Sequence, residues 1–454
     1  MNDFMKINIP PGAADIIQKL DARGFDAYVV GGCVRDCLMG RMAEDWDITT
    51  EARPDEIKAV FAGRKTLDIG ERHGTVAVNA LGKYYEVTTY RIDGVYSDGR
   101  RPDAVSFTDS LREDLCRRDF TINAMAYNDK AGLMDYFGGH DDVKSRVVRC
   151  VGTAAARFAE DYLRIMRAYR FAATLGFELA PDVRQAAIDG RKNLHNIAVE
   201  RVRVEFMKML LSDDFDRIEM FFTDCGDTLF PEITALAGFE QHNPYHCHDV
   251  LGHTFRALRA TPPDPALRLA ALYHDTGKLH TRTTDAAGIH HFYGHEAVSA
   301  KIAAAALEHW RFDNHTTDRV LTIIKHHGND YGTGGGRAVK RTAIKRLLNK
   351  LGPDAARDVL NFQAADNMAK SDKVKAGKLQ TVLAAKALLE DIISADEPVK
   401  ISDLAITGRD VMKELGISPS AAVGEHLQYL MEQVIADPAA NTYENLVELL
   451  HRRS

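Results

Sequence analysis

The pattern of hydrophobic residues changes near residue 150, and this change constrains the fold more than any other feature of the 454-residue chain. Before it, short runs rich in β-branched and aromatic residues, at 26–30, 75–79 and 85–90, predict strands between helical stretches. After it, hydrophobic residues recur at helical spacing, including one long stretch at 154–175, and hardly any strand signal returns. The sequence therefore predicts an α+β protein, with a small mixed sheet at the N-terminal end and an all-helical remainder.

Charge and cysteine content narrow the classes of protein. Acidic side chains number 65 and basic ones 58, so a uniformly basic nucleic-acid binder is excluded, whereas locally basic surfaces are not. The six cysteines contain no C-x-x-C pair, which fits reduced thiols better than a disulfide framework or a zinc ribbon. No apolar stretch is long enough to span a membrane, and the first residues lack a secretion-signal pattern. We therefore expect a cytoplasmic protein without a membrane partner.

A glycine turn follows the first predicted strand. The segment from Tyr28 reads YVVGGCVRD, so the strand runs into Gly31 and Gly32 and then into a helix that carries Arg35 in its first turn. Glycine lets the backbone approach a bulky anion, and a helix N-terminus adds positive charge. Taken alone, a Gly-Gly pair after a strand is more often only a tight turn.

Two aspartates follow about a dozen residues later. Asp45 and Asp47 flank one tryptophan, and on a strand residues i and i+2 point to the same face, so the two carboxylates converge. Close carboxylates repel unless a cation lies between them, and hard oxygen ligands suit Mg²⁺. Glu86, on a neighbouring predicted strand, is the best third carboxylate. An exposed pair with Arg91 or Lys83 is nearly as good an interpretation of Glu86.

The strings GGCVRDCLMGR and EDWDITT resemble the signature of the class II tRNA nucleotidyltransferase and poly(A) polymerase family. RRDFTINAMAY at 117–127 resembles the second family motif, and EDYLRIMRAYR at 160–170 resembles the motif that selects the base. ISDLAITGRDVMKELGISP and DPAANTYENLVELL are similar to the C-terminal region of CCA-adding members. The resemblance spans nearly the whole chain, in the expected order.

The resemblance implies an enzyme that joins the tRNA 3′-hydroxyl to the α-phosphate of CTP or ATP, adding C, C and A and releasing pyrophosphate. It implies Mg²⁺ held by the catalytic residues Asp45 and Asp47, and the tRNA acceptor arm, CTP and ATP as partners; Glu86, chosen from its position on the neighbouring strand, is the third expected catalytic residue. The residues that it implies in nucleotide binding are Gly31, Gly32, Arg35, Arg117, Arg118, Asp119, Asn123, Asp161, Arg164, Arg167 and Arg170. Asp119 is expected to hold one of the two preceding arginines in position.

Asp161 and Arg164 carry the expected choice of base. They lie at i and i+3 of the long predicted helix, so their side chains share a face. A carboxylate accepts and a guanidinium donates hydrogen bonds, so the two together can imitate the pairing partner of a base. The resemblance implies that they read the Watson–Crick edges of CTP and ATP. Without it, an ordinary helix ion pair is the simpler interpretation.

Histidines and aspartates recur on successive predicted helices of the second half. His253, the pair His274-Asp275 and Asp366 offer imidazole and carboxylate ligands for a divalent cation that activates water. Their order resembles the HD phosphohydrolase superfamily, which implies a second divalent metal such as Mn²⁺ or Ni²⁺ and a possible hydrolase activity. That resemblance also makes His295 a candidate for a further ligand, together with either His326 or His327. A retained helical scaffold without activity is the alternative.

We expect four parts: a nucleotidyltransferase head at 1–150, a helical neck that selects nucleotides and binds RNA at 151–235, an HD-type helical domain at 236–395 and a helical tail at 396–454. Basic groups at 100–101, 201, 203 and 340–350 are candidate contacts to the tRNA backbone. The loop at 91–101 is where the family carries a flexible element, and a glycine-rich connection is predicted at 331–337.

Three rival functions remain from the sequence. The nearest is a poly(A) polymerase or an enzyme that adds only C or only A, because the transfer chemistry is the same. A second is a metal-dependent HD phosphohydrolase in which the head only binds RNA. A non-enzymatic RNA-binding protein is the least favoured. The sequence leaves the oligomeric state open.

Overall fold

The computed structural model describes residues 6–70, 74–94, 104–243, 245, 247–331 and 338–453. The chain forms two compact units, Met1–Pro231 and Glu232–Ser454, and each is described by itself. Most of the loop predicted at 91–101, including the two arginines at 100–101, and nearly all of the glycine-rich connection at 331–337 lie outside the described residues. Within the described ranges, no helix has the length and apolar character needed to cross a membrane.

The first unit is built on one mixed sheet, and the three predicted strands are confirmed within it. The order of its strands is β3 (Thr66–Gly70), β4 (Thr75–Ala80), β5 (Lys83–Thr89), β2 (Asp47–Thr50), β1 (Ala27–Val30), β8 (Met125–Asn128) and β9 (Gly132–Asp135). Strand β2 pairs antiparallel with β1 and parallel with β5, so these three central strands run side by side. The sheet therefore brings together chain segments that are far apart in the sequence.

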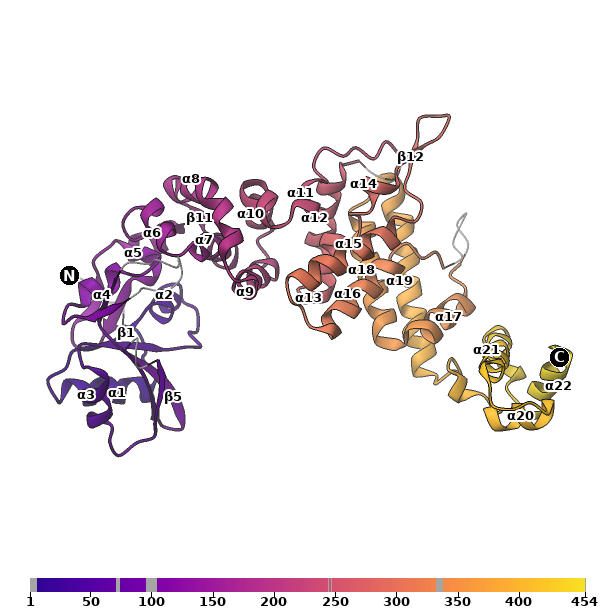
Figure 1. Ribbon diagram of the computed structural model, residues 1–454, viewed down its shortest axis with the longest axis horizontal. Helices are drawn as coiled ribbons and strands as arrows, with labels where there is room; N and C mark the ends of the chain where they lie inside the picture. The colour runs from indigo at the N-terminus through magenta and orange to yellow at the C-terminus, as the bar shows by residue number, and fades with distance from the viewer. Residues whose placement is uncertain are drawn as a thin grey trace. The chain divides into compact units, whose positions relative to one another are not determined.

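Short helices cover and connect the strands. α1 (Pro11–Asp21) and α3 (Pro54–Val60) pack against each other and against β4 (Figure 1). Ile16, Ile17 and Leu20 of α1 are buried, which is the helical spacing of a single apolar face. The other elements around the sheet are α2 (Gly32–Leu38), β6 (Arg91–Asp93), β7 (Val105–Phe107), α4 (Leu111–Cys116), the 3₁₀ turn η2 (Thr121–Asn123), α5 (Gly139–Ser145) and β10 (Val147–Val148).

The helical half of the first unit corrects one prediction. The single long helix expected at 154–175 is two helices, α6 (Ala154–Glu160) and α7 (Leu163–Leu175). Asp161 ends α6 with an extended backbone, φ −148°, and its carboxylate accepts the N–H of Leu163 at 3.0 Å. An aspartate that bonds the backbone two residues on competes with helix continuation, which explains the break.

The remaining elements of this unit complete a second, apolar core. They are β11 (Glu178–Leu179), α8 (Pro181–Gly190), the 3₁₀ helix η3 (Arg191–Asn196), α9 (Val199–Leu210) and α10 (Phe215–Leu229). Phe206, Phe221, Phe222 and Phe230 form a cluster of rings, with centroids 4.3 to 6.4 Å apart. The predicted helix at 200–211 is confirmed as α9.

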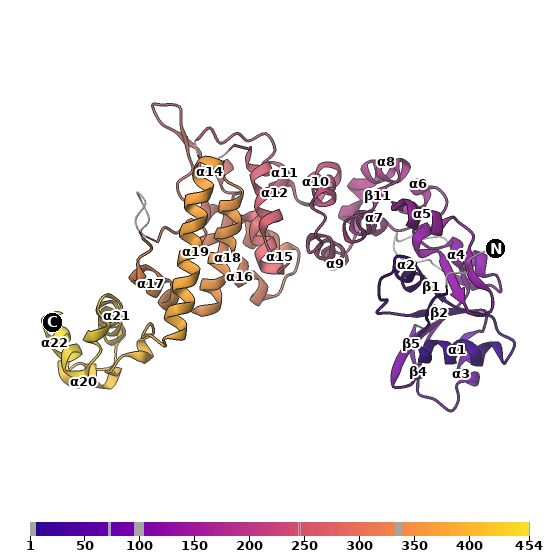
Figure 2. The ribbon, with the colours of Figure 1, turned by 180° about the vertical axis from the view of Figure 1, so that it is seen from behind.

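The second unit is helical, as predicted (Figure 2). Its main bundle contains α12 (Val250–Ala260), α13 (Pro265–Tyr273), α15 (His295–His309), α16 (Asn314–His326), α18 (Pro353–Met368) and α19 (Asp372–Ser394). The smaller elements of this unit are α11 (Pro231–Thr234), α14 (Lys278–Thr281), the two-residue strands β12 (Thr283–Thr284) and β13 (His290–His291), and α17 (Arg341–Leu351). The C-terminal elements are the 3₁₀ turn η4 (Ile401–Asp403), α20 (Gly408–Leu415), α21 (Ala421–Ala436), the 3₁₀ turn η5 (Pro438–Ala440) and α22 (Tyr443–Arg453). The α+β architecture expected from the sequence is confirmed.

The basic segment at 340–350 has acidic partners inside this unit. Arg341 pairs with Asp391 at 2.7 Å, the buried Lys345 with Glu397 at 2.7 Å, and Arg346 with Glu432 at 2.8 Å. These pairs weaken the expectation that the segment forms a basic surface for tRNA.

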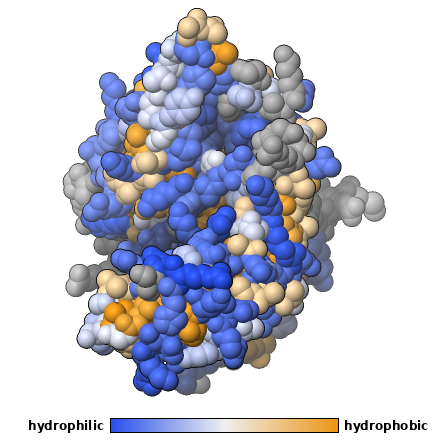
Figure 3. All heavy atoms as spheres, turned by 90° about the vertical axis from the view of Figure 1, so that its right-hand side faces the viewer, coloured by the Kyte–Doolittle hydropathy of each residue, from blue (hydrophilic) through white to orange (hydrophobic). Residues whose placement is uncertain are grey.

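On the face drawn in Figure 3, hydrophilic residues dominate and apolar residues form separate small groups.

Candidate active site and metal cluster

The glycine turn lies where the sequence predicts it, between β1 and α2. Gly31 has a φ of +83°, and its N–H donates to the carbonyl of Met125 at 3.0 Å. A Cβ atom at this position would lie 3.0 Å from a terminal nitrogen of Arg118. The positive φ favours glycine here, and a side chain at this position would also push against the end of Arg118.

Three carboxylates lie on one face of the sheet next to this turn. Asp45 and Asp47 are exposed, whereas Trp46 between them is buried, as expected, but β2 begins only at Asp47, so Asp45 precedes the strand on which the sequence placed it. Strands β2 and β5 are parallel, with Ile48 opposite Val87. Asp47 and Glu86 each precede one of these partners, so their side chains project from the same face.

The charges of the three carboxylates are only partly compensated. Burial raises the pKa of Glu86, and the neighbouring Asp47 and Asp45 raise it further. Burial also raises the pKa of Asp47; Arg118 opposes this shift and Asp45 adds to it. A cation between them would relieve this repulsion, and carboxylate oxygens are ligands that Mg²⁺ prefers. The donor set therefore fits a divalent metal.

The cations considered as partners of Glu86 have other partners. Lys83 donates to the carbonyl of Glu44 at 2.9 Å. Arg91 pairs with Asp93 at 3.1 Å. These contacts favour the reading of Glu86 as part of the carboxylate group over a surface ion pair with either cation.

The two arginines before Asp119 are held by a residue that the sequence reasoning missed. Asp114, fully buried in α4, accepts from Arg117 at 2.8 Å and lies 3.6 Å from Arg118. Asp119 acts on Arg118 through its charge, which opposes the lowering of the Arg118 pKa by burial, but its hydrogen bonds with other side chains among the described residues are with Asn123 and Arg167. The signal for Asp114 was present, because positions three and four residues apart on a helix are neighbours.

Asp119 instead belongs to a chain of buried hydrogen bonds. Arg35 donates to the Asn123 Oδ1 at 2.6 Å, Asn123 donates to the Asp119 Oδ1 at 3.3 Å, and Arg167 donates to the Asp119 Oδ2 at 2.7 Å. Burial would raise the pKa of Asp119, but Arg167 holds it at about 2. Four of the predicted nucleotide-binding residues, taken from three distant segments, are thus brought together.

Arg170 meets a further acidic residue without a predicted role. Glu205 of α9 is buried and accepts from Arg170 at 2.8 Å, and its other oxygen lies 3.7 Å from Arg167. One carboxylate therefore serves two of the predicted arginines. Nothing in the sequence spacing connects Glu205 with α7, because the contact depends on the packing of two helices.

Asp161 and Arg164 are near each other in sequence but are not a pair on one helix face. Asp161 lies in the break before α7 and accepts from Arg201 at 2.7 Å. Arg164 pairs with Glu160 and donates to the carbonyl of Arg157 at 2.9 Å. The predicted helical i, i+3 geometry is therefore wrong, for the reason given by the break at Asp161. Arg201, considered as a tRNA contact, holds Asp161 instead.

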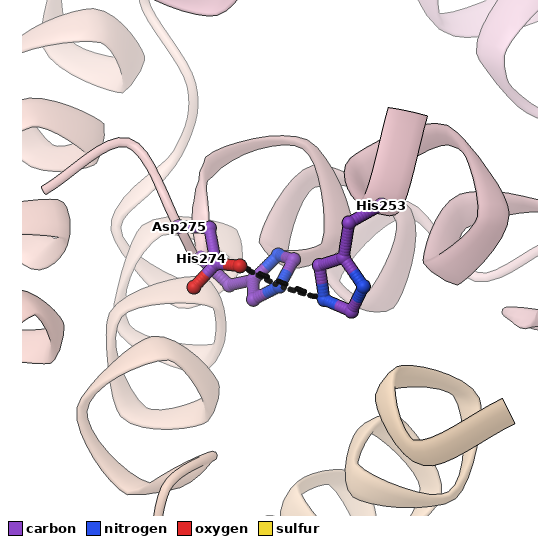
Figure 4. Close-up of side chains that lie close together, drawn as sticks. All are labelled: His253, His274 and Asp275. Carbon is purple, nitrogen blue, oxygen red and sulfur yellow. Dashed lines mark hydrogen bonds and ion pairs between the residues drawn. The ribbon is translucent and has the colours of Figure 1, made fainter. Parts of the chain in front are cut away.

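The second constellation converges as predicted. His253 of α12 lies 2.9 Å from Asp366 of α18 and 3.5 Å from Asp275, and His274 lies 3.2 Å from Asp275. Figure 4 shows the rings of His253 and His274 and the carboxylate of Asp275 directed toward one another. The four side chains are almost completely buried. We call them the histidine–aspartate cluster.

Two further histidines extend this cluster. The second oxygen of Asp275 lies 3.3 Å from His295 and 4.0 Å from His327. His327 is buried beside the cluster, whereas His326 is partly exposed and bonds Asn329. The histidine that faces inward is therefore His327. Two sets of donors could hold a metal: His253, His274 and Asp275, and Asp275, His295 and His327.

Lysines compensate the charge of the cluster. Lys278 lies 2.7 Å from Asp275, and Lys370 lies 2.6 Å from Asp366. Burial would raise the pKa of Asp275, but His274 and Lys278 hold it well below its usual range. Burial lowers the pKa of His327 to about 3. An ionised Asp275 and a neutral His327 are the protonation states in which these two groups bind metals, so these donors fit a divalent cation.

Three family models match this chain. The poly A polymerase head domain matches residues 27–149. The "Probable RNA and SrmB- binding site of polymerase A" matches residues 176–236, and a model of tRNA nucleotidyltransferase domain 2 matches residues 289–450. The matched head segment contains the glycine turn, the three carboxylates and the buried hydrogen bonds of Asn123 and Asp119.

Curated relatives and solved structures agree with these matches. The CCA-adding enzyme of Lactobacillus delbrueckii subsp. bulgaricus is 35% identical over 443 residues, 96% of each chain. That of Geobacillus stearothermophilus is 51% identical over 198 residues, 44% of this chain and 48% of the relative. The crystal structure of the Bacillus stearothermophilus CCA-adding enzyme in complex with CTP has a TM-score of 0.71 and 30% identity over 98% of each chain. The chain therefore belongs to the family of CCA-adding enzymes, which are nucleotidyltransferases.

Proposed function

We propose that this protein adds C, C and A to the 3′ end of tRNA, using CTP and ATP and releasing pyrophosphate. One observation carries the proposal: Asp45, Asp47 and Glu86 gather on an open face of the sheet, beside a glycine turn that admits Arg118. Relatives over nearly the whole length bear the name of CCA-adding enzymes, which supports this reaction over others of the same chemistry.

In the proposed reaction the tRNA 3′-oxygen bonds to the α-phosphorus of the nucleotide, the bond to pyrophosphate breaks, and the hydroxyl loses its proton. Asp45, Asp47 and Glu86 would hold Mg²⁺, which when bound makes the attacking hydroxyl more acidic and supplies positive charge to the leaving oxygen. Burial and neighbouring carboxylates raise the pKa values of Asp47 and Glu86, and a bound cation would relieve this repulsion, which supports the proposal.

The arginines bind the triphosphate in this proposal. Guanidinium groups donate in a fork that matches phosphate oxygens. Asp119 would act on the nucleotide mainly by holding Arg167, and Arg117 is kept among the proposed nucleotide-binding residues without a separate role. The residues assigned to the phosphates and sugar are Gly31, Gly32, Arg35, Arg118, Asn123, Arg167 and Arg170.

Asp161 and Arg164 are assigned to the choice of base. In the structure each has a different partner, Arg201 for the carboxylate and Glu160 for the guanidinium. To bind a base, Asp161 and Arg164 would use hydrogen-bonding atoms that Arg201 and Glu160 do not occupy, or would exchange these partners for the base.

We also propose the four-part division into head, neck, HD-type domain and tail, with the ranges given above.

The test uses tRNA that ends at its discriminator base, Mg²⁺, and CTP, ATP or both, with the products sequenced at the 3′ end. Addition of C, C and A followed by a stop is expected. A long A tail would instead assign a poly(A) polymerase. Addition of only C, or of A to tRNA that already ends in CC, would assign a partial activity.

We also propose that the histidine–aspartate cluster binds a divalent metal such as Mn²⁺ or Ni²⁺ and hydrolyses phosphate esters. The observation that favours this second function is the convergence of His253, His274, Asp275 and Asp366 from three separate helical segments into one buried site. The order of these residues resembles the HD phosphohydrolases, and a metal there would make a bound water more acidic. The pKa values of Asp275 and Asp366 are held well below their usual range, so both carboxylates would be available as metal ligands.

The hydrolase proposal is tested by release of phosphate from 2′,3′-cyclic and 2′-nucleotides with Mn²⁺ or Ni²⁺. Activity is expected for the wild type and not for a His274→Ala/Asp275→Ala double variant. Equal release by the two proteins would contradict the proposal. Far-UV circular dichroism and urea denaturation of the same double variant serve as the control for folding.

A further inference from the structure

Three arginine side chains meet on one buried aromatic ring in the first unit. The guanidinium carbon of Arg170 lies 3.5 Å from the centroid of the Phe171 ring, that of Arg35 at 5.2 Å and that of Arg167 at 5.3 Å. Phe171 is 4% exposed, and the ring of Phe120 packs edge-on against it, with centroids 5.6 Å apart. We call Phe171 and the three arginines the arginine–phenylalanine cluster.

Three like charges around one ring need compensation, and the structure supplies it from two directions. Acidic and amide groups bond the guanidinium nitrogens: Asp36 and Asn123 bond Arg35, Asp119 bonds Arg167, and Glu205 bonds Arg170. The ring offers the second support, because the electron-rich face of an aromatic ring attracts cations within about 6 Å of its centroid. An acceptor and the ring together fix where each guanidinium lies.

The cluster connects two parts of the proposed nucleotide site. Arg35 lies on α2, immediately after the glycine turn, and Arg167 and Arg170 lie on α7. The hydrogen bonds from Arg35 through Asn123 and Asp119 to Arg167 join the same two elements. The Phe171 ring is thus a common contact of all three arginines that are assigned to the triphosphate from α2 and α7.

We propose that Phe171 is a positioning residue for nucleotide binding, whose ring holds Arg35, Arg167 and Arg170 in the arrangement that receives the triphosphate. The ring does not touch the nucleotide in this proposal. It acts through the arginines, by keeping three mutually repelling cations close together before the substrate arrives. The inference rests on the proposed function, because that function assigns these arginines to the nucleotide.

The test replaces Phe171 by phenylalanines that carry one, two, three and five fluorine atoms. Fluorine withdraws electron density from the ring face and changes the size of the ring little, so the attraction for cations weakens stepwise. Phe221 is the matched control, since it is fully buried and its contacts are with the rings of Tyr169, Phe206, Phe222 and Phe230. Binding of CTP and of ATP without tRNA is measured by equilibrium dialysis, and KM and kcat are measured with tRNA.

We expect the dissociation constants of CTP and ATP to rise together with each fluorine at residue 171, by about tenfold for the fully fluorinated ring. KM should rise in parallel, with a smaller change in kcat, and the series at residue 221 should show no trend. Phe171→Leu should match the fully fluorinated protein, whereas Phe221→Leu should lose stability with wild-type nucleotide affinity in the protein that remains folded.

A flat series at residue 171 would overturn the inference, and so would equal trends at residues 171 and 221. Failure of the proposed function gives a different result, namely a wild-type protein that binds CTP and ATP but does not add C, C and A to tRNA. The dialysis measurement needs no transfer, so it tests the role of Phe171 independently of the product.

Discussion

The protein shifts the pKa values of carboxylates in opposite directions at its two candidate sites. In the first unit, Asp47 and Glu86 remain accessible to solvent but are partly desolvated, and this desolvation together with neighbouring carboxylates raises their pKa values. In the second unit, the fully buried Asp275 and Asp366 have pKa values held well below the usual range, because histidines and lysines outweigh the effect of burial. Exposure alone would predict the reverse order.

The two sites differ in the positive charges that lie close to their carboxylates. At the exposed site the carboxylates repel one another, so a cation bound there would relieve a repulsion. The histidine–aspartate cluster has internal cations in Lys278 and Lys370, which lie 2.7 Å from Asp275 and 2.6 Å from Asp366. The exposed and the buried carboxylates thus differ in the groups that balance their charge.

The largest expected effect comes from removing a carboxylate of the exposed site. Asp45→Ala or Asp47→Ala should lower the rate of nucleotide addition by at least about a thousandfold, because a metal-dependent transfer loses a ligand. Binding of tRNA, measured by filter retention, should stay close to that of the wild type. Near-normal turnover by either variant would show that the transfer site has been assigned wrongly.

The comparison is sharpened by neutralising one aspartate in each site. Asp275→Asn should lower the free energy of unfolding by about 3 kcal/mol, because it leaves the buried Lys278 without its charged partner. Asp47→Asn should not destabilise the protein, because the fold already disfavours the charge of Asp47. Urea denaturation of both variants measures the difference, and equal losses would remove the contrast between the sites.

A third prediction concerns the pH dependence of stability. Folding lowers the pKa of Asp119 from an ordinary value near 3.8 to about 2. The resulting stabilisation, about 2 kcal/mol, is complete above the unfolded pKa and is lost as the pH falls from about 4 toward 2. The difference in unfolding free energy between the wild type and Asp119→Asn should therefore narrow between pH 6 and pH 2.5. A constant difference would show that Arg167 does not hold the charge of Asp119.

The smallest effect is expected in base selection. Asp161→Ala should reduce the preference for CTP and ATP over UTP and GTP by about tenfold, equivalent to about 1.4 kcal/mol. Asp227→Ala is the matched control, since Asp227 also pairs with an arginine, Arg191 at 3.3 Å, but lies outside the proposed site. Competition between the four nucleotides in one reaction measures the preference. Equal changes in the two variants would argue against Asp161 as a reader of the base.

Much of the architecture could be predicted from the sequence. Period-two and helical patterns identified the central strands and most helices, and the alternation at Asp45–Asp47 predicted which side chains are exposed. The resemblance to a family directed attention to residues that the fold then brings together, such as Arg35 and Arg167. These successes depend on local spacing or on motifs that are continuous in the sequence.

The predictions failed where a side chain's partner depends on local backbone bonding or on how the helices pack. The break at Asp161 depends on a side chain that bonds its own backbone, which helical periodicity does not reveal. The partners of Arg117 and Arg170 are Asp114 and Glu205, and Glu205 meets α7 only through the packing of two helices. The choice of His327 over His326 is likewise made by the direction in which the end of α16 faces the bundle.

The most direct test of the central claim measures both activities in three proteins: the wild type, Asp45→Ala/Asp47→Ala and His274→Ala/Asp275→Ala. We predict that the first double variant loses CCA addition and keeps phosphate release with Mn²⁺ or Ni²⁺, and that the second shows the reverse. Loss of CCA addition in the His274→Ala/Asp275→Ala variant, with its first unit folded, would contradict the separation of the two sites.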